Sequence, residues 1–236
     1  HTTILSDGGS TSKSMLDTYV LEPFLNSKGI RRIDYVFVSH ADSDHISGII
    51  GLIENDADRI GTLMLPQSQS AEKQFEQLLT AAKKKQIPVK WISKGDVFSL
   101  KTLPDLSFEV LWPSKNEKSD DANESSLVWR LNYHDFSMLF TGDLPGVCED
   151  ELVNLKPVTV LKVAHHGSDY STNKSFLQQI TPQLAVISCS ENNRYGHPKE
   201  SVLDILSNSN IYRTDKDGTI EIELNKNEYK IKTCSP

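Results

Sequence analysis

The sequence predicts an α/β protein in which two β-sheets are covered by helices. Short runs of β-branched and aromatic residues, such as 33–39 (IDYVFVS), are typical of buried strands. Segments with apolar residues at helical spacing, such as 71–86, alternate with these runs in both halves of the chain. The order of strands and helices therefore favours two sheets with helices packed outside them. The 236 residues contain no repeat and no low-complexity linker.

The expected elements follow from these periodicities in chain order. Apolar residues at helical spacing predict a helix over 14–28, which ends at Gly29, and a second helix directly after His45. Later helices are expected at 71–86, 149–155, 173–179 and 199–207. Strands are expected at 2–5, 33–39, 62–65, 89–92, 108–112, 126–133, 137–140, 159–163, 184–188, 212–214, 218–224 and 228–232.

Composition excludes several classes of protein. Hydrophobic residues make up 37% and charged residues 24%, which is typical of a globular domain, and no stretch approaches the roughly 18 apolar residues of a membrane span. The net charge of −7 gives no general attraction for nucleic acid, so DNA binding needs metal ions or a local basic patch, for which Lys83-Lys84-Lys85 is a candidate. The beginning HTTIL is not a signal peptide, and we expect a domain excised from a longer protein.

The strongest local pattern is Ser39-His40-Ala41-Asp42-Ser43-Asp44-His45, directly after a predicted buried strand. Imidazole nitrogen suits zinc and manganese, and carboxylate oxygen suits harder ions. Clustered carboxylates repel one another unless a cation lies between them. The segment therefore predicts metal ligands, which are His40, Asp42, Asp44 and His45.

Two later strands end in the same kinds of side chain. One leads through Phe-Thr-Gly to Asp143, and another delivers His165 and His166 into a turn that contains glycine. His197 follows in Tyr-Gly-His-Pro. Any one of these residues alone is as well explained by an ordinary loop or a helix cap. Three strand-end clusters in one chain predict that they converge on one site.

Together these motifs resemble the metallo-β-lactamase superfamily. The resemblance lies in the order Asp-Gly-Gly, His-x-Asp-x-Asp-His, Gly-Asp and His-His-Gly-Ser. It implies a single domain over 1–236, folded as a four-layered αββα sandwich with metals between the sheet edges. More particularly, SHADSDHISGI, NESSLVWRL, LFTGDL, LKVAHHGSDYST, NRYGHP and YRTDKDG resemble the C-terminal domain of the ComEC family of DNA-uptake channel proteins. This likeness covers nearly the whole chain.

The resemblance implies two divalent metal ions and no organic cofactor. A firm site would use Asp44, His45, Asp143 and one of the two adjacent histidines, with His165 taken as the ligand. A looser site would use His40, Asp42 and Asp143, and Asp7 would support the metal-binding loops from behind. The sequence departs from the superfamily pattern in two places.

Asp42 stands where the common signature has a second histidine, and Asn123 replaces the usual histidine of the third motif. Both changes exchange nitrogen for oxygen, which favours Mn²⁺ first, with Zn²⁺ or Mg²⁺ as alternatives.

The resemblance also implies a function, the hydrolysis of DNA phosphodiester bonds to degrade the strand that is not taken up. Asp44 would orient the attacking water, and His166 and His197 would bind phosphate or protonate the leaving oxygen. Substrate contacts would come from Asn123, Ser125 and Ser168. The partners implied are DNA and the membrane channel portion of the same full-length protein, on the outer face of the bacterial cell membrane.

Two alternatives remain open. A phosphodiesterase of the phosphocholine-esterase type would need an aromatic cage for a quaternary ammonium, for which Tyr133, Tyr170 and Tyr195 are available. A non-catalytic module that binds DNA or a partner is the second alternative, favoured by the two missing histidines. Such a module would tolerate Asp44→Ala and Asp143→Ala, whereas a hydrolase would lose activity.

Overall fold

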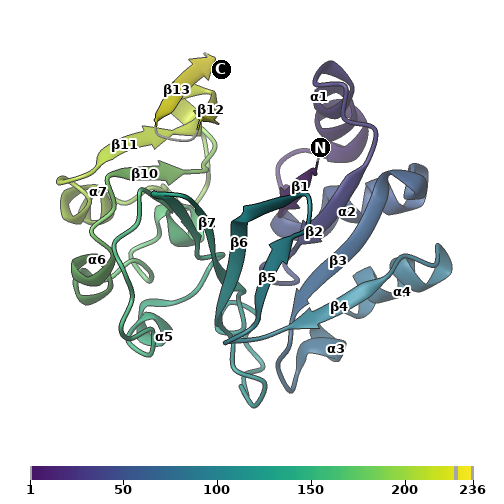
Figure 1. The fold of residues 1–236 in the computed structure, drawn as a ribbon, viewed down its shortest axis with the longest axis horizontal. Helices are drawn as coiled ribbons and strands as arrows, with labels where there is room; N and C mark the ends of the chain where they lie inside the picture. Colours follow the sequence, from purple (N-terminus) through teal and green to yellow (C-terminus); the bar gives the residue numbers. More distant parts are fainter. Residues whose placement is uncertain (1, 226–227, 235–236) are drawn as a thin grey trace. The chain divides into compact units, whose positions relative to one another are not determined.

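The computed structural model describes residues 2–225 and 228–234, whose contacts divide the chain into two compact units. The first unit comprises residues 1–94 and 113–127, and the second comprises residues 95–112 and 128–236. Each unit has its own β-sheet (Figure 1). The sequence predicts two sheets with helices packed outside them. Each unit contains one such sheet, so this prediction is confirmed.

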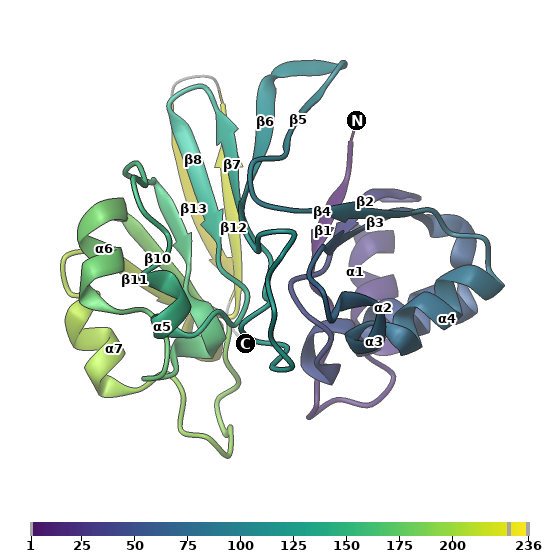
Figure 2. The ribbon, with the colours of Figure 1, turned by 90° about the horizontal axis from the view of Figure 1, so that it is seen from below.

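The first unit is built on a parallel four-stranded sheet in the order β1-β2-β3-β4. Its strands are β1 (Ile4–Ser6), β2 (Ile33–Phe37), β3 (Ile60–Pro66) and β4 (Val89–Ile92). Its helical segments are η1 (Asp17–Leu21), α1 (Glu22–Ser27), α2 (Ser43–Asn55), η2 (Ala57–Arg59), α3 (Ala71–Gln74) and α4 (Glu76–Lys84). The helices α1 to α4 lie on one face of the sheet (Figure 2), where Val36, Leu52, Leu63 and Leu78 are fully buried.

Three expected helices of this unit differ in detail. The helix expected over 14–28 begins with a π-helical turn, Asp17–Leu21, before it becomes α-helical. The helix expected over 71–86 is divided at Phe75. The prediction that a helix starts after His45 is wrong, because α2 begins at Ser43 and Asp42 before it is extended. A carboxylate in the first turn of a helix is stabilised by the helix dipole, which explains the earlier start.

The second unit contains a mixed seven-stranded sheet in the order β11-β10-β9-β8-β7-β6-β5. Its strands are β5 (Val97–Leu100), β6 (Leu103–Trp112), β7 (Val128–Tyr133), β8 (Phe136–Phe140), β9 (Val160–Lys162), β10 (Leu184–Ile187) and β11 (Asn210–Arg213). Its helical segments are α5 (Gly146–Glu149), η3 (Ala164–Gly167), α6 (Lys174–Ile180), α7 (Glu200–Ile205) and α8 (Thr214–Asp217). The strands β12 (Thr219–Leu224) and β13 (Tyr229–Cys234) form a separate antiparallel hairpin.

Both faces of this sheet are covered by elements of the same unit. The helices α5, α6 and α7 pack on one face through a cluster that includes Leu161, Phe176 and Val202. The hairpin β12–β13 packs against Val160 and Val186. The strands β8 to β11 are parallel, so their carboxyl ends meet at one edge of the sheet.

One helix expected in the second unit is wrong, and one strand is missed by the sequence analysis. The helix expected over 149–155 is not formed, because α5 spans only Gly146–Glu149 and Asn154 takes a left-handed conformation at φ 60°. The strand β5 was not expected. It pairs with β6 along alternating exposed and half-buried residues, so its sequence lacks the continuous apolar run of a buried strand.

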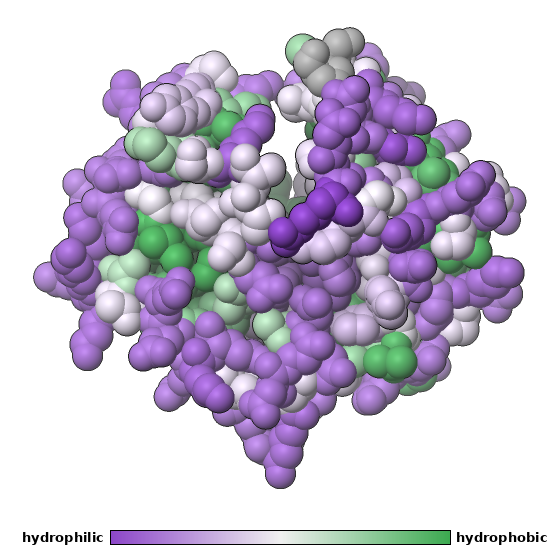
Figure 3. All heavy atoms as spheres, turned by 180° about the vertical axis from the view of Figure 1, so that it is seen from behind, coloured by the Kyte–Doolittle hydropathy of each residue, from purple (hydrophilic) through white to green (hydrophobic). Residues whose placement is uncertain are grey.

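The surface is mainly hydrophilic on the face drawn in Figure 3, where hydrophobic residues form separate small patches. Exposed apolar side chains include Met15, Tyr19 and Phe24 near the start of the first unit. Among the described residues, every helix is too short or too polar to cross a membrane.

Candidate functional site

In the first unit, the predicted residues meet where β1 and β2 end. Asp7 follows β1, and its backbone N–H donates to the carbonyl of Phe37 at the end of β2 (2.9 Å). One carboxylate oxygen of Asp7 accepts the N–H of Ser39 (2.7 Å), and the other lies 3.1 Å from Nδ1 of His45. Burial raises the pKa of Asp7, but the imidazole of His45 and the N–H of Ser39 outweigh this effect and leave the pKa below its ordinary value. Asp7 therefore contacts both Ser39 and His45, and its support of a metal site stays a prediction.

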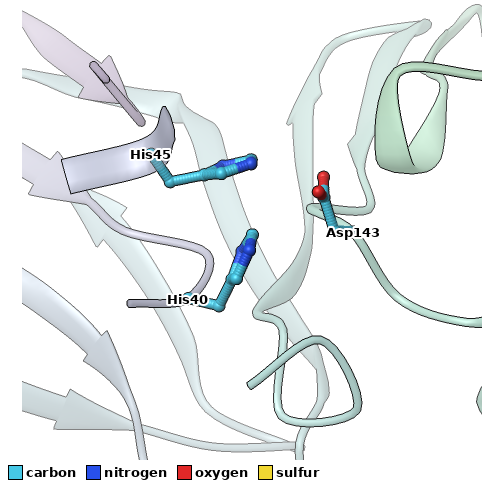
Figure 4. A group of neighbouring side chains, drawn as sticks. All are labelled: His40, His45 and Asp143. Carbon is cyan, nitrogen blue, oxygen red and sulfur yellow. The ribbon is translucent and has the colours of Figure 1, made fainter. Parts of the chain in front are cut away.

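The histidines of this loop lie side by side. The ring centroids of His40 and His45 are 4.0 Å apart, and Figure 4 draws the two rings. Both rings are buried, and both Nδ1 atoms lie near the hydroxyl of Ser39, at 3.0 and 3.1 Å. Asp42 is 3.7 Å from Nε2 of His40, which holds the pKa of Asp42 below its usual range. Asp44 lies in the first turn of α2. The structure thus brings the four residues of this loop into one neighbourhood.

The segment 123–127 is tied to the same loop. The backbone N–H of Leu127 donates to the carbonyl of Ser39 at 2.7 Å. Among the described residues, the side-chain oxygens of Asn123 and Ser125 are buried and have no hydrogen-bond partner. A buried polar atom without a partner is costly, so these oxygens are suited to a ligand. Their role in substrate contact stays a prediction.

In the second unit, the carboxyl ends of β8 and β9 bring Asp143 together with the two adjacent histidines. Nε2 of His165 is 3.9 Å and Nε2 of His166 is 3.8 Å from the same carboxylate oxygen of Asp143. The backbone N–H of His165 donates to the carbonyl of Gly142 at 3.1 Å, which fixes the two turns to each other. Asp143 is buried, and Figure 4 shows its side chain beside the end of its strand.

Both histidines of this turn have an unusual backbone. His165 and His166 have φ values of 48° and 56°, in the left-handed region that residues other than glycine rarely adopt. Nδ1 of His166 lies 2.8 Å from the carbonyl oxygen of Ser188, which follows β10. Two consecutive strained residues at the end of a buried strand are typical of a functional site.

His197 and Ser168 lie next to this turn. The rings of His197 and His165 are 5.8 Å apart and nearly perpendicular. Burial, His165 and Lys199 together lower the pKa of His197 below its ordinary value, which favours the neutral imidazole. Ser168 is 1% exposed, and its hydroxyl accepts the N–H of Tyr170 at 3.3 Å. The hydroxyl of Ser168 is therefore used within its own loop, and a phosphate contact by Ser168 stays a prediction.

The sequence analysis does not single out two contact residues, one in each unit. Ser39 joins His40 to His45 through its hydroxyl, and the carbonyl of Ser188 orients His166. The only sequence signal for Ser39 is its position directly before His40. A carbonyl contact leaves no trace in the sequence, because every residue has a carbonyl group.

The donor chemistry of each unit fits a divalent metal ion. Each unit offers imidazole nitrogen together with carboxylate oxygen, the mixture that zinc and manganese accept. In each unit one histidine has Nδ1 against an oxygen, Asp7 for His45 and the Ser188 carbonyl for His166. This contact orients a metal-binding imidazole and leaves Nε2 with the lone pair that binds the ion.

One protein-family model covers both groups of donors. Residues 2–169 match the model of the β-lactamase superfamily domain, so the matched segment includes both Asp7 and His166. The chain is 38% identical over 207 residues to ComE operon protein 3 of Bacillus subtilis, covering 86% of this chain and 26% of that protein. It is 32% identical over 217 residues to competence protein ComA of Neisseria gonorrhoeae, covering 88% and 28%. The chain thus spans about a quarter of the length of these relatives.

A solved structure supports the fold. The metallo-β-lactamase fold protein YhfI of Bacillus subtilis matches with a TM-score of 0.54 at 14% identity, covering 89% of this chain and 83% of that one. The expected α/β fold class is therefore confirmed. A family model that spans most of the chain, together with this likeness in fold, shows that the chain belongs to the metallo-β-lactamase superfamily.

Proposed function

We propose that the chain is a metal-dependent nuclease that hydrolyses DNA phosphodiester bonds. The observation that carries this proposal is the pair of oriented histidines. His45 and His166, each in its own unit, have Nδ1 against an oxygen acceptor, which prepares Nε2 for a metal. A purely structural role would explain one buried histidine with a hydrogen bond. It would not explain why a histidine in each unit has Nδ1 against an oxygen acceptor and lies beside a carboxylate.

We propose that both groups of donors hold the same two ions. In this proposal, His40, His45 and Asp143 would hold one ion, and Asp44, His45 and His166 would hold the other. Asp42 would add an oxygen to the first. A single family model spans both groups, which supports their joint use. The oxygen-rich set favours Mn²⁺, with Zn²⁺ or Mg²⁺ as alternatives.

The choice between the two adjacent histidines follows from their contacts. The sequence led us to expect His165 as the ligand and His166 as a catalytic group. The carbonyl of Ser188 fixes the proton of His166 on Nδ1, so Nε2 of His166 carries the lone pair that a metal ion binds. We therefore assign the metal to His166 and substrate contact to His165.

The remaining side chains would act on the substrate. Bound divalent ions would supply Lewis acidity toward the phosphate and activate water. Asp44 would accept a hydrogen bond from the attacking water. His165 and His197, whose rings are 5.8 Å apart, would contact phosphate oxygens and deliver a proton to the leaving oxygen.

The assignment of DNA as the substrate rests on the relatives. One is named as a competence protein and another as a product of a com operon, and this chain corresponds to a part of each. We propose that the domain degrades the strand that is not transported. In this proposal the membrane channel portion of the full-length protein is its partner, on the outer face of the cell membrane.

The test is cleavage of 5′-labelled single- and double-stranded DNA in Mn²⁺, Mg²⁺, Zn²⁺ or EDTA. Asp143→Ala is compared with Asp204→Ala, a matched change at an exposed carboxylate in α7. We expect cleavage in Mn²⁺ that disappears in EDTA and in Asp143→Ala but persists in Asp204→Ala. DNA that is bound but not cleaved in any metal would exclude a nuclease and support a binding module.

A further inference from the structure

The loop 190–199 is fixed against the turn that carries the two adjacent histidines. The backbone N–H of Lys199 donates to the carbonyl of Gly167 at 2.9 Å. Pro198 packs so closely on Gly167 that a Cβ at that glycine would come within 2.5 Å of it. Asn193 binds both backbone groups of His197, its N–H at 2.8 Å and its carbonyl at 2.7 Å. Side chains on this loop therefore have a defined position next to His165 and His166.

Two side chains at the tip of this loop are exposed and ordered by each other. Tyr195 is 56% exposed, and Arg194 is exposed as well. The guanidinium group of Arg194 lies over the ring of Tyr195, 4.6 Å from its centroid, and donates to the phenol oxygen. Tyr195 also stacks with the ring of His197, two residues later, with 5.7 Å between the ring centroids and 26° between the ring planes. The three groups form a pre-arranged set of flat surfaces.

The chemistry of this set selects among ligands. The guanidinium plane that lies over the ring of Tyr195 is itself a flat surface on which a nucleobase can stack, held in place by the ring beneath it, and its positive charge attracts the adjoining phosphate. A quaternary ammonium, by contrast, would be repelled by the cation that already lies over the ring. Bases within a duplex are already stacked on their neighbours, so the surface suits an unpaired base.

We propose that Arg194 and Tyr195 form a subsite that stacks one unpaired base of single-stranded DNA. The subsite rests on the proposed nuclease function, because it names the part of the substrate next to the cleaved phosphate. The contact between His197 and His165 places it beside the candidate catalytic turn of the same unit. The subsite would make a single strand, or a frayed end, the preferred substrate over an intact duplex.

The test is binding of a fluorescent thymidine oligonucleotide to the 236-residue chain in EDTA, so that no cleavage occurs. A second oligonucleotide has the same length and charge but abasic sugars throughout. Tyr195→Leu and Tyr195→Phe are compared with Tyr19→Leu, a change at another exposed tyrosine, in the π-helical turn of the first unit. Arg194→Gln is measured over a series of salt concentrations.

We expect Tyr195→Leu to weaken binding of the thymidine oligonucleotide about tenfold and to leave abasic binding unchanged, as stacking on one base predicts. Tyr195→Phe and Tyr19→Leu should each stay within about twofold of the unaltered chain. Arg194→Gln should reduce the slope of log affinity against log salt by about 0.7, the value for one phosphate contact on a single strand.

The subsite would be overturned if Tyr195→Leu lowered the affinity for both oligonucleotides equally, or lowered neither affinity. Competition by phosphocholine would also overturn it. The outcome is separable from the nuclease proposal, which is judged by cleavage. Binding that depends on Tyr195 without cleavage in any metal would retain the subsite and reject the nuclease. Metal-dependent cleavage with unchanged binding in Tyr195→Leu would retain the nuclease and reject the subsite.

Discussion

Nδ1 of His166 lies 2.8 Å from the carbonyl oxygen of Ser188, which follows the neighbouring parallel strand β10. A carbonyl oxygen only accepts hydrogen bonds, so Nδ1 carries the proton and Nε2 carries the lone pair. The contact sets both the tautomer and the orientation of the ring, and it joins two strand ends of one sheet. The assignment of His166 rather than His165 to the metal depends on this contact.

This assignment predicts unequal effects for two adjacent substitutions. His166→Gln should lower the affinity for Mn²⁺ by at least about tenfold, because a ligand is lost, whereas His165→Gln should change it by less than about threefold. Titration calorimetry with Mn²⁺ would measure both variants. A larger loss in His165→Gln would return the ligand role to His165.

Asp7 is predicted to act on the metal through the residues that it holds. Asp7→Asn keeps the shape of the side chain but weakens the contacts with Nδ1 of His45 and with the N–H of Ser39. Metal affinity should fall about 10- to 100-fold, the usual effect of removing a carboxylate behind a ligating histidine. The control is Asp204→Asn in α7, and equal affinities in the two variants would refute a supporting role for Asp7.

Gly9 is predicted to be essential for the position of α2. A Cβ at Gly9 would lie 2.5 Å from backbone atoms of Ser43 and Asp44, and 2.6 Å from the N atom of His45. Gly9→Ala must therefore displace the first turn of α2, with a loss of about 1–3 kcal/mol in the free energy of unfolding and weaker metal binding. Gly146→Ala, whose added Cβ would be no closer than 3.4 Å to a neighbour, is the matched control for urea unfolding.

Glu149 is predicted to make stability depend on pH. Its carboxylate is fully buried and accepts the N–H groups of Thr172 (2.8 Å) and Asn173 (2.7 Å). Burial raises the pKa of Glu149 from 4.5 to about 7, against the opposing effect of these two N–H groups. Between those values the unfolded chain has released the proton and the folded chain still holds it. The free energy of unfolding should therefore fall as the pH rises from about 4.5 to about 7, by on the order of 3 kcal/mol.

Urea unfolding at several pH values would measure this effect against Glu149→Gln, which cannot titrate. The unaltered chain should lose stability relative to the variant as the pH rises through this window. Parallel curves for the two proteins would show that Glu149 keeps its ordinary pKa in the folded state.

Much of the fold could be predicted because its periodicities are strong. The strand β4 (Val89–Ile92) has the predicted bounds, and the buried strand β2 was expected two residues longer than it is. The ends of elements that depend on tertiary contacts are harder to predict from the sequence. The start of α2 at Ser43 and the interruption at Phe75 involve backbone conformations that hydrophobic spacing does not encode.

The candidate site could be predicted as a set of residue types, but not as a set of contacts. His40, Asp143 and His166 could be found because each closely follows a strand, and His45 could be found because it completes the motif that begins at His40. The contacts that assign their tautomers come from Asp7, a carboxylate more than thirty residues away, and from a backbone carbonyl. Such contacts depend on strand order, which a single sequence does not reveal.

The proposal that both groups of donors hold the same metal ions rests on the single family model that covers them, and metal binding by variants of both groups tests it most directly. Mn²⁺ binding would be measured by titration calorimetry for His45→Gln, Asp143→Asn and the double variant. We expect each single variant to weaken the same binding event, with the double variant losing much less than the sum of the two. Losses that add, with each single variant removing a separate ion and leaving the other unchanged, would contradict a shared site.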